Sequence, residues 1–126
     1  MSRARAPMRV LLALLYLIAG VLHLAVPRPF LSIMPDFVPM PVVVVALTGV
    51  AEIAGAVGLM IPRLRRAAGW GLAAYALCVW PANVQHAIND LTTGTGLPVL
   101  YHAARLALQP LIIAWALWAG GIIRRR

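Results

Sequence analysis

The amino-acid sequence predicts an all-α integral membrane protein, a four-helix bundle that forms a single domain over residues 1–126. Hydrophobic residues make up 63% of the chain and charged residues only 11%, whereas a soluble domain is about half apolar and a quarter charged. Four apolar segments are each long enough to cross a bilayer, and arginine-rich stretches flank them. Together these observations indicate a bundle whose outer surface faces lipid.

The four segments predict the helices one by one. A helix needs about 20 residues to cross the hydrocarbon layer, and no stretch alternates with the period of two that a β-barrel strand requires. The expected helices are residues 8–26, 42–61, 67–88 and 98–123. The first has a basic flank like a signal peptide, but it lacks a clean cleavage site and we interpret it as a retained helix.

The arginines predict the topology. All eleven basic residues are Arg, and nine lie at the N-terminus, in the turn at residues 62–66 and at the C-terminus. The other two connections hold only Arg28 together with Asp36 and Asp90. The positive-inside rule therefore places both termini in the cytoplasm, which predicts a multi-pass protein of the cytoplasmic (inner) membrane. The net charge of +8 does not indicate nucleic acid, because apolar spans separate the arginines.

The first outer connection, residues 27–41, holds five of the ten prolines. Its apolar side chains predict a segment that lies at the membrane interface or folds over the mouth of the bundle. Cys78 is the single cysteine, so the chain has neither an internal disulfide nor a CxxC pair.

Polar side chains inside membrane spans are costly and indicate function by default. Glu52 lies midway along the second span on a face of small residues, which predicts that it points into the bundle. Arg105 in the fourth span is its natural counter-charge, although both side chains tilt outward and Gln109 is level with Glu52 by residue count. The pair is therefore expected as a direct, bent or water-bridged contact, and Arg105 could instead extend alone toward the membrane surface.

Further candidates come from every span, and all of them fall in the half away from the cytoplasm. Pro81 and Pro110 free backbone carbonyls beside them. The predicted ligand-binding residues are Glu52, Arg105, His23, Asn83, Gln109, Trp80, Tyr101 and His86. A purely structural role, fixing the register of the helices, is an equally consistent interpretation of Glu52 and its neighbours. No metal is predicted, because the histidines His23, His86 and His102 lack the spacing of a bundle metal site.

Motifs along nearly the whole chain resemble the DoxX family of small four-helix membrane proteins. They are AGVLHLAVPRPF, IMPDFVPMP, GVAEIAGAVGLMIPRLRRAAGWGL, PANVQHA and RLALQPLIIAWALW. The resemblance implies a cytoplasmic-membrane protein linked to redox systems, since relatives include a subunit of a thiosulfate:quinone oxidoreductase. It supplies no list of catalytic residues.

Three functional hypotheses follow. The first is an accessory protein of a membrane redox system that binds a small molecule such as a quinone. The second is a ligand-free structural or assembly partner of a membrane complex, and a homo-oligomer is compatible with either. The third, transport of a small molecule or protons, lacks a polar path through the cytoplasmic half. No haem pair, CxxC or nucleotide loop is present, so the sequence does not decide whether the chain catalyses a reaction.

Overall fold

The computed structural model describes residues 3–123, and the arginines at 124–126 lie outside the described residues. Over the described residues the chain is all-helical and contains no strand. Its helices are α1 (Arg5–Ala25), α2 (Arg28–Ser32), α3 (Pro41–Met60), α4 (Arg65–Thr93) and α5 (Val99–Ala119). The expected helices therefore form with shifted ends, and a short fifth helix, α2, was not predicted.

Three of the helices, α1, α3 and α5, are long and apolar enough to cross a membrane. The remaining long helix, α4, has 29 residues and does not meet that standard of apolarity, because its second half contains Pro81, Asn83, His86 and Asp90. Its C-terminal end lies beyond residue 88, the expected end of the span. Gly94 terminates the helix in the left-handed conformation with φ 68°, which glycine adopts without strain.

The long helices pack as two pairs, α1 along α3 and α4 along α5, with fewer contacts between the pairs. Small residues let the paired helices approach closely. A Cβ added at Gly20 of α1 would lie 2.7 Å from the carbonyl oxygen of Gly49 in α3, and one added at Gly69 of α4 would lie 2.9 Å from the Cα of Gly120. These glycines fix the distance between helices within each pair.

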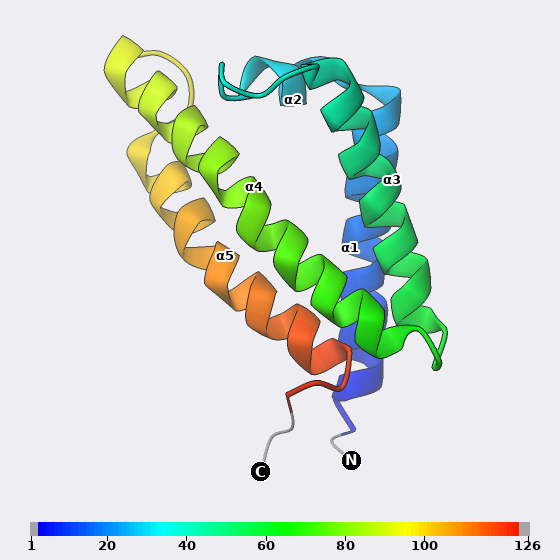
Figure 1. Cartoon of the computed structure of the whole chain (residues 1–126). Helices are drawn as coiled ribbons and strands as arrows, with labels where there is room; N and C mark the ends of the chain where they lie inside the picture. Colours follow the sequence, from blue (N-terminus) through cyan, green and yellow to red (C-terminus); the bar gives the residue numbers. More distant parts are fainter. Residues whose placement is uncertain (1–2, 124–126) are drawn as a thin grey trace.

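The two pairs meet at the end that holds both termini and diverge toward α2 (Figure 1). We call the end around Leu12, Leu59, Leu72, Ala116 and Ala119 the closed half. These side chains are at most 2% exposed and form one apolar cluster. We call the other end, from Thr48, Tyr75 and Gln109 to α2, the open half.

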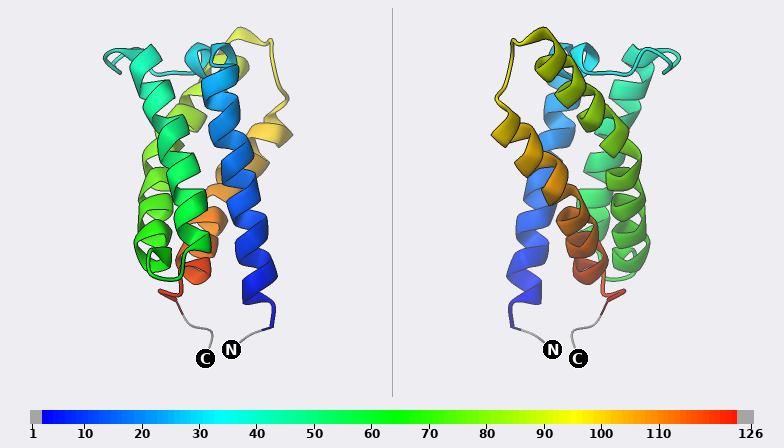
Figure 2. Two further views of the ribbon diagram at one scale, coloured as in Figure 1. Left: turned by 90° about the vertical axis from the view of Figure 1, so that its right-hand side faces the viewer. Right: turned by 90° about the vertical axis from the view of Figure 1, so that its left-hand side faces the viewer.

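The proline-rich connection folds over the open half, at the end of the molecule opposite the termini (Figure 2). Pro29 lies in the first turn of α2, where its missing N–H leaves no hydrogen bond unmade. Phe30 from α2 and Phe37 from the following loop both line the space between the helix pairs. This placement matches the second of the two expected arrangements, in which the segment folds over the mouth of the bundle.

Candidate functional site

The open half contains a cavity of about 1160 Å³ between the two helix pairs. Its walls are mainly apolar and come from all four long helices together with α2 and the loop that follows it. A concave, mostly apolar space with a few convergent polar groups is the usual form of a small-molecule site. The polar and ionisable side chains in the walls therefore decide what the cavity can bind.

Glu52 is the most buried charged residue in these walls, with 2% of its surface exposed. The Tyr75 hydroxyl of α4 donates a hydrogen bond to its Oε1, and His23 Nδ1 of α1 lies 3.5 Å from the same oxygen. The other oxygen, Oε2, is buried and has no hydrogen-bond partner among the described residues. The carboxyl group is thus anchored through one oxygen and unsatisfied at the other.

His23 is fixed by its own helix and by α2. Its Nδ1 lies 2.7 Å from the Ala19 carbonyl oxygen. Because a carbonyl only accepts, Nδ1 carries the proton in this contact. The Phe30 ring stacks on the imidazole at a centroid distance of 3.7 Å and an interplanar angle of 19°. This stack connects α2 to α1 through His23, the same side chain that contacts Glu52.

Asn83 and Gln109 join α4 to α5. Asn83 Nδ2 donates to Gln109 Oε1 at 3.5 Å, and Gln109 Nε2 donates to the Ala76 carbonyl oxygen at 2.6 Å. Ala76 directly precedes Leu77, the residue whose carbonyl Pro81 leaves without its helical donor. The two amides are 8% and 6% exposed, respectively, and one hydrogen bond between them joins α4 to α5.

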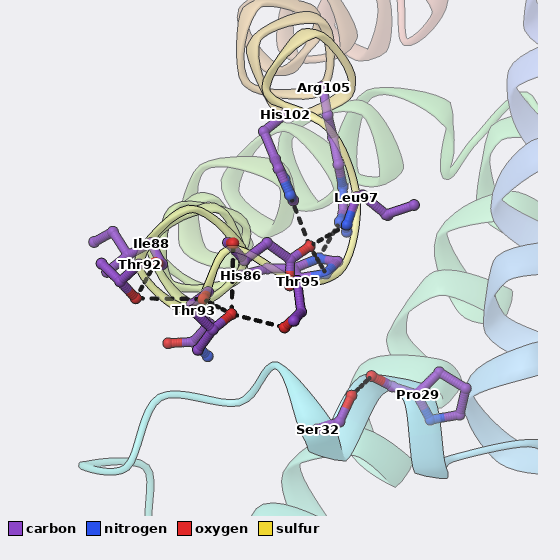
Figure 3. Close-up of polar contacts among 12 residues, drawn as sticks. Pro29, Ser32, His86, Ile88, Thr92, Thr93, Thr95, Leu97, His102 and Arg105 are labelled. Carbon is purple, nitrogen blue, oxygen red and sulfur yellow. Dashed lines mark hydrogen bonds and ion pairs between the residues drawn. The ribbon is translucent and has the colours of Figure 1, made fainter.

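Arg105 does not pair with Glu52. Its Nη1 donates to His86 Nδ1 at 2.9 Å. The structure therefore also differs from the alternative in which Arg105 extends toward the membrane surface without a partner. Side chains tilt toward helix N-termini, and this carries the guanidinium away from the level of Glu52 and toward the end of α4. Figure 3 shows Arg105 and His102 of α5 pointing toward α4, where Arg105 contacts His86.

Asp90 completes this outer cluster. His86 Nε2 lies 3.2 Å and His102 Nε2 lies 2.9 Å from its Oδ2, and the Leu97 backbone N–H donates to the same oxygen at 2.9 Å. The Leu97 hydrogen bond, reinforced by His102 and His86, lowers the pKa of the Asp90 carboxyl below its usual value. The cluster therefore carries a carboxylate that fixes the loop between α4 and α5.

The His86, Asp90 and His102 ligand atoms all lie within 4.8 Å of one another, which is close enough to surround a metal ion. The Arg105 contact opposes that use. Arginine only donates, so His86 must accept at Nδ1 and carry its proton on Nε2, the atom that would have to bind the metal. The guanidinium would also repel a cation.

The structure brings most of the predicted ligand-binding residues to one cavity. Six of the eight line it: Glu52, Arg105, His23, Asn83, Gln109 and Tyr101. Trp80 and His86 are not in the walls. His86 instead accepts a hydrogen bond from Arg105, which does line the cavity. The buried Trp80 Nε1 has no hydrogen-bond partner among the described residues.

Sequence reasoning missed Tyr75, the direct partner of Glu52. Tyrosine is common in membrane helices and carries no charge, so nothing in composition singled it out. A signal was nevertheless present, since Tyr75, Val79 and Asn83 follow one another at i, i+4 spacing on α4 and all line the cavity. Thr48, one turn before Glu52 on α3, is part of the same wall.

Comparisons with known proteins identify the chain at the level of its family. No curated protein and no solved structure matches it. One family model matches residues 12–120, from the first turns of α1 to the end of α5. The chain therefore belongs to the family described as Domain of unknown function (DUF8561).

Proposed function

We propose that the chain is an accessory protein of a redox system in the cytoplasmic membrane, and that its open half binds a lipophilic small molecule with a polar head, such as a quinone. The observation that carries this proposal is the cavity of about 1160 Å³ with the buried Glu52 carboxyl in its wall. Burial of an ionisable group inside a membrane helix is expensive, and such groups are retained mainly where they act on a ligand or ion.

The proposed topology has four spans, formed by α1, α3, α4 and α5, and both termini in the cytoplasm. The described arginines of the closed half support it. Arg9 Nε donates to the Ala119 carbonyl oxygen at 2.8 Å, Arg65 Nε donates to Leu59 at 3.0 Å, and Arg66 Nη1 donates to Gly121 at 3.2 Å. Cationic side chains at helix ends on one side of a membrane favour that side as cytoplasmic.

The redox link rests on the resemblance to the DoxX family, and the cavity is consistent with it. Six aromatic side chains line the cavity: Tyr16, Phe30, Phe37, Tyr75, Tyr101 and Trp115. Aromatic walls hold a planar ring by edge and offset-stacked contacts. A flat ring with a lipid-soluble tail therefore suits both the walls and a location inside the bilayer.

Binding to nanodiscs tests the proposal. A quinone with a decyl tail would be incubated with protein-loaded and protein-free nanodiscs, the discs would be sedimented, and bound ligand would be quantified by mass spectrometry. We expect saturable excess binding to the loaded discs. The variants Glu52→Gln and Arg105→Ala should each abolish it while the protein still inserts, and unchanged binding in both would refute the site.

A matched pair of variants separates the cavity from the lipid-facing surface. Ala104→Phe places a ring in the cavity wall, whereas Ala107→Phe adds the same ring one turn further along α5, outside the wall. Both alanines are exposed. Binding should be lost in the first variant and retained in the second. Equal binding in the two would show that the quinone associates with the outer surface.

A structural role is the second candidate, and one observation favours it for part of the polar set. Asn83 donates to Gln109, and Gln109 donates to the Ala76 carbonyl oxygen, which is the pattern expected of a pair that only fixes helix register. Replacing both with apolar residues of similar size should then leave quinone binding intact, because such exchanges are often neutral. The same exchange at Glu52 distinguishes the two functions.

A further inference from the structure

The polar group in the cavity wall that most needs a partner is an acceptor, not a donor. Glu52 Oε1 receives the Tyr75 hydroxyl, while Oε2 is buried and has no partner among the described residues. Several cavity donors already have acceptors, since His23 bonds Ala19, Gln109 bonds Ala76 and Arg105 bonds His86. A buried oxygen that stays unsatisfied is costly, and a ligand that satisfies it gains that free energy on binding.

We infer that the ligand of this cavity carries a hydroxyl group on an aromatic ring, and that this hydroxyl hydrogen-bonds Glu52 Oε2. The inference rests on the proposed function and names the chemical class that the site selects. A hydroxyl both donates and accepts. It therefore donates to Oε2 when Glu52 is ionised and accepts from it when Glu52 is protonated. A ketone oxygen satisfies only the protonated carboxyl, so the site favours a phenol or reduced quinol over the oxidised quinone.

The geometry at Glu52 gives this contact a simple route. Tyr75 holds Oε1, and Oε2 is shielded in the structure, so the carboxyl must turn partly toward the cavity to meet a ligand. That rotation is about the terminal side-chain bond, whose torsion is broad and carries a low barrier. Glu52 lies midway along α3, so a ring that meets Oε2 would lie in the inner part of the cavity, away from α2.

Charge in the wall selects against cationic ligands. The ionisable side chains that line the cavity are Glu52 and Arg105, with His23, Cys78 and the tyrosines. A ligand ammonium would gain from the carboxylate but would also be repelled by the Arg105 guanidinium in the same cavity wall. A neutral hydroxyl forms the same hydrogen bond without that penalty.

The test compares two ligands that differ only in whether the ring carries a hydroxyl group, which can donate a hydrogen bond, or a methoxy group, which cannot. Para-nonylphenol and para-nonylanisole share ring and tail, and neither is redox-active under the assay. Their binding to protein-loaded nanodiscs would be measured by sedimentation, with partition into protein-free discs subtracted. We expect the phenol to bind at least about tenfold more tightly than the anisole, because a hydrogen bond to a carboxylate has that magnitude or more.

A variant at Glu52 tests whether the tighter binding of the phenol depends on this carboxyl group. In Glu52→Gln the carboxylate acceptor at Oε2 is lost, so the phenol should lose its advantage and bind no better than the anisole. If Glu52→Gln still bound the phenol more tightly than the anisole, the phenol hydroxyl would have to bond a group other than Glu52 Oε2, and the inference would be overturned. The wild-type ratio stands as a test even where this variant does not fold.

The outcomes distinguish the inference from the proposed function. Equal binding of phenol and anisole to the wild type, lost in Ala104→Phe, would overturn hydroxyl selection and leave the cavity as a ligand site. Saturable binding of neither compound, together with no binding of the quinone, would remove the proposed function itself. Tight phenol binding that Ala104→Phe abolishes would support both.

Discussion

The two halves of the molecule use the same helices in opposite ways. In the closed half, small and aliphatic side chains bring both helix pairs into contact, and Leu59, Ala116 and Ala119 are fully buried. In the open half the pairs diverge around a cavity whose walls hold Glu52, Asn83, Gln109 and Arg105. The difference indicates that the closed half supplies the packing that holds the bundle, which leaves the open half free to keep an unfilled space and an unsatisfied carboxyl.

The largest expected effect is truncation of the closed-half core. Leu72 is 2% exposed and packs in the apolar cluster. Leu72→Ala should lower the free energy of unfolding in detergent by about 2–5 kcal/mol, because it removes buried apolar contacts and leaves a cavity. The matched control is Leu108→Ala, which truncates a cavity-lining leucine that is 50% exposed.

That control should change stability by less than about 1 kcal/mol, since the removed atoms are already accessible. Thermal or denaturant unfolding followed by circular dichroism measures both. Similar losses in the two variants would contradict the division into a packed half and an open half.

The next effect concerns the anchor of Glu52. Tyr75→Phe removes the hydroxyl that donates to Oε1. Among the described residues, His23 is then the one polar side chain still paired with the buried carboxyl. A loss of about 1–3 kcal/mol in unfolding free energy is expected, the usual result of removing one partner of a buried hydrogen bond. Tyr101→Phe is the comparison, because Tyr101 is 43% exposed, and it should be within about 0.5 kcal/mol of wild type. A neutral Tyr75→Phe would show that Glu52 is not held by this bond.

Helix contact in the closed half can be tested at two glycines of α4 that are two residues apart. A Cβ at Gly69 would meet the Gly120 Cα at 2.9 Å, whereas a Cβ at Gly71 would have nothing within 4 Å. Gly69→Ala should destabilise by about 1–3 kcal/mol through overpacking, while Gly71→Ala should stabilise by about 0.5–1 kcal/mol through backbone entropy. Effects of the same sign in unfolding experiments would place the α4–α5 contact elsewhere.

The smallest effect is local and depends on pH. The pKa of Asp90 is lowered from its usual 3.8, first by the Leu97 backbone hydrogen bond. A carboxyl with a depressed folded-state pKa stabilises the fold above its unfolded pKa, and this contribution is lost as pH falls through the folded value. Exchange of the Leu97 amide hydrogen, corrected for intrinsic rates, should therefore stay protected near neutral pH and lose protection below about pH 3.8. Asp90→Asn should remove the pH dependence, and an unaltered profile in that variant would exclude Asp90 as its source.

The sequence predicted the long helices well because lipid demands long apolar segments, and such segments are visible without any contact information. Helix ends were less accurate where a helix extends beyond its apolar part. The span expected to end at residue 88 continues as α4 to Thr93, and the Thr92 and Thr93 hydroxyls bond back to carbonyls of the preceding turn. Hydropathy therefore predicts which residues lie in the membrane, but it does not predict where the helix ends.

The side-chain partners were less predictable than the helices. Glu52 was expected on an interior face because its helical neighbours are small, and it is buried there. The Tyr75–Glu52 and Arg105–His86 contacts depend on how the helices pack against one another. The sequence pattern of one helix does not contain that information. The short helix α2 was not predicted, because five residues that include Pro29 are too few to show a helical periodicity.

The most direct test of a ligand site in the open half is photolabelling in nanodiscs. A nonylphenol that carries a diazirine in its tail next to the ring would be irradiated with the protein, and the adducts would be mapped by peptide mass spectrometry. The account predicts adducts on cavity-lining residues of α1, α4 and α5, such as Tyr16, Val79 and Leu108, and their loss in Ala104→Phe. Adducts on the exposed face of α3 at Val42, Leu47 and Val50, unaffected by that variant, would contradict it.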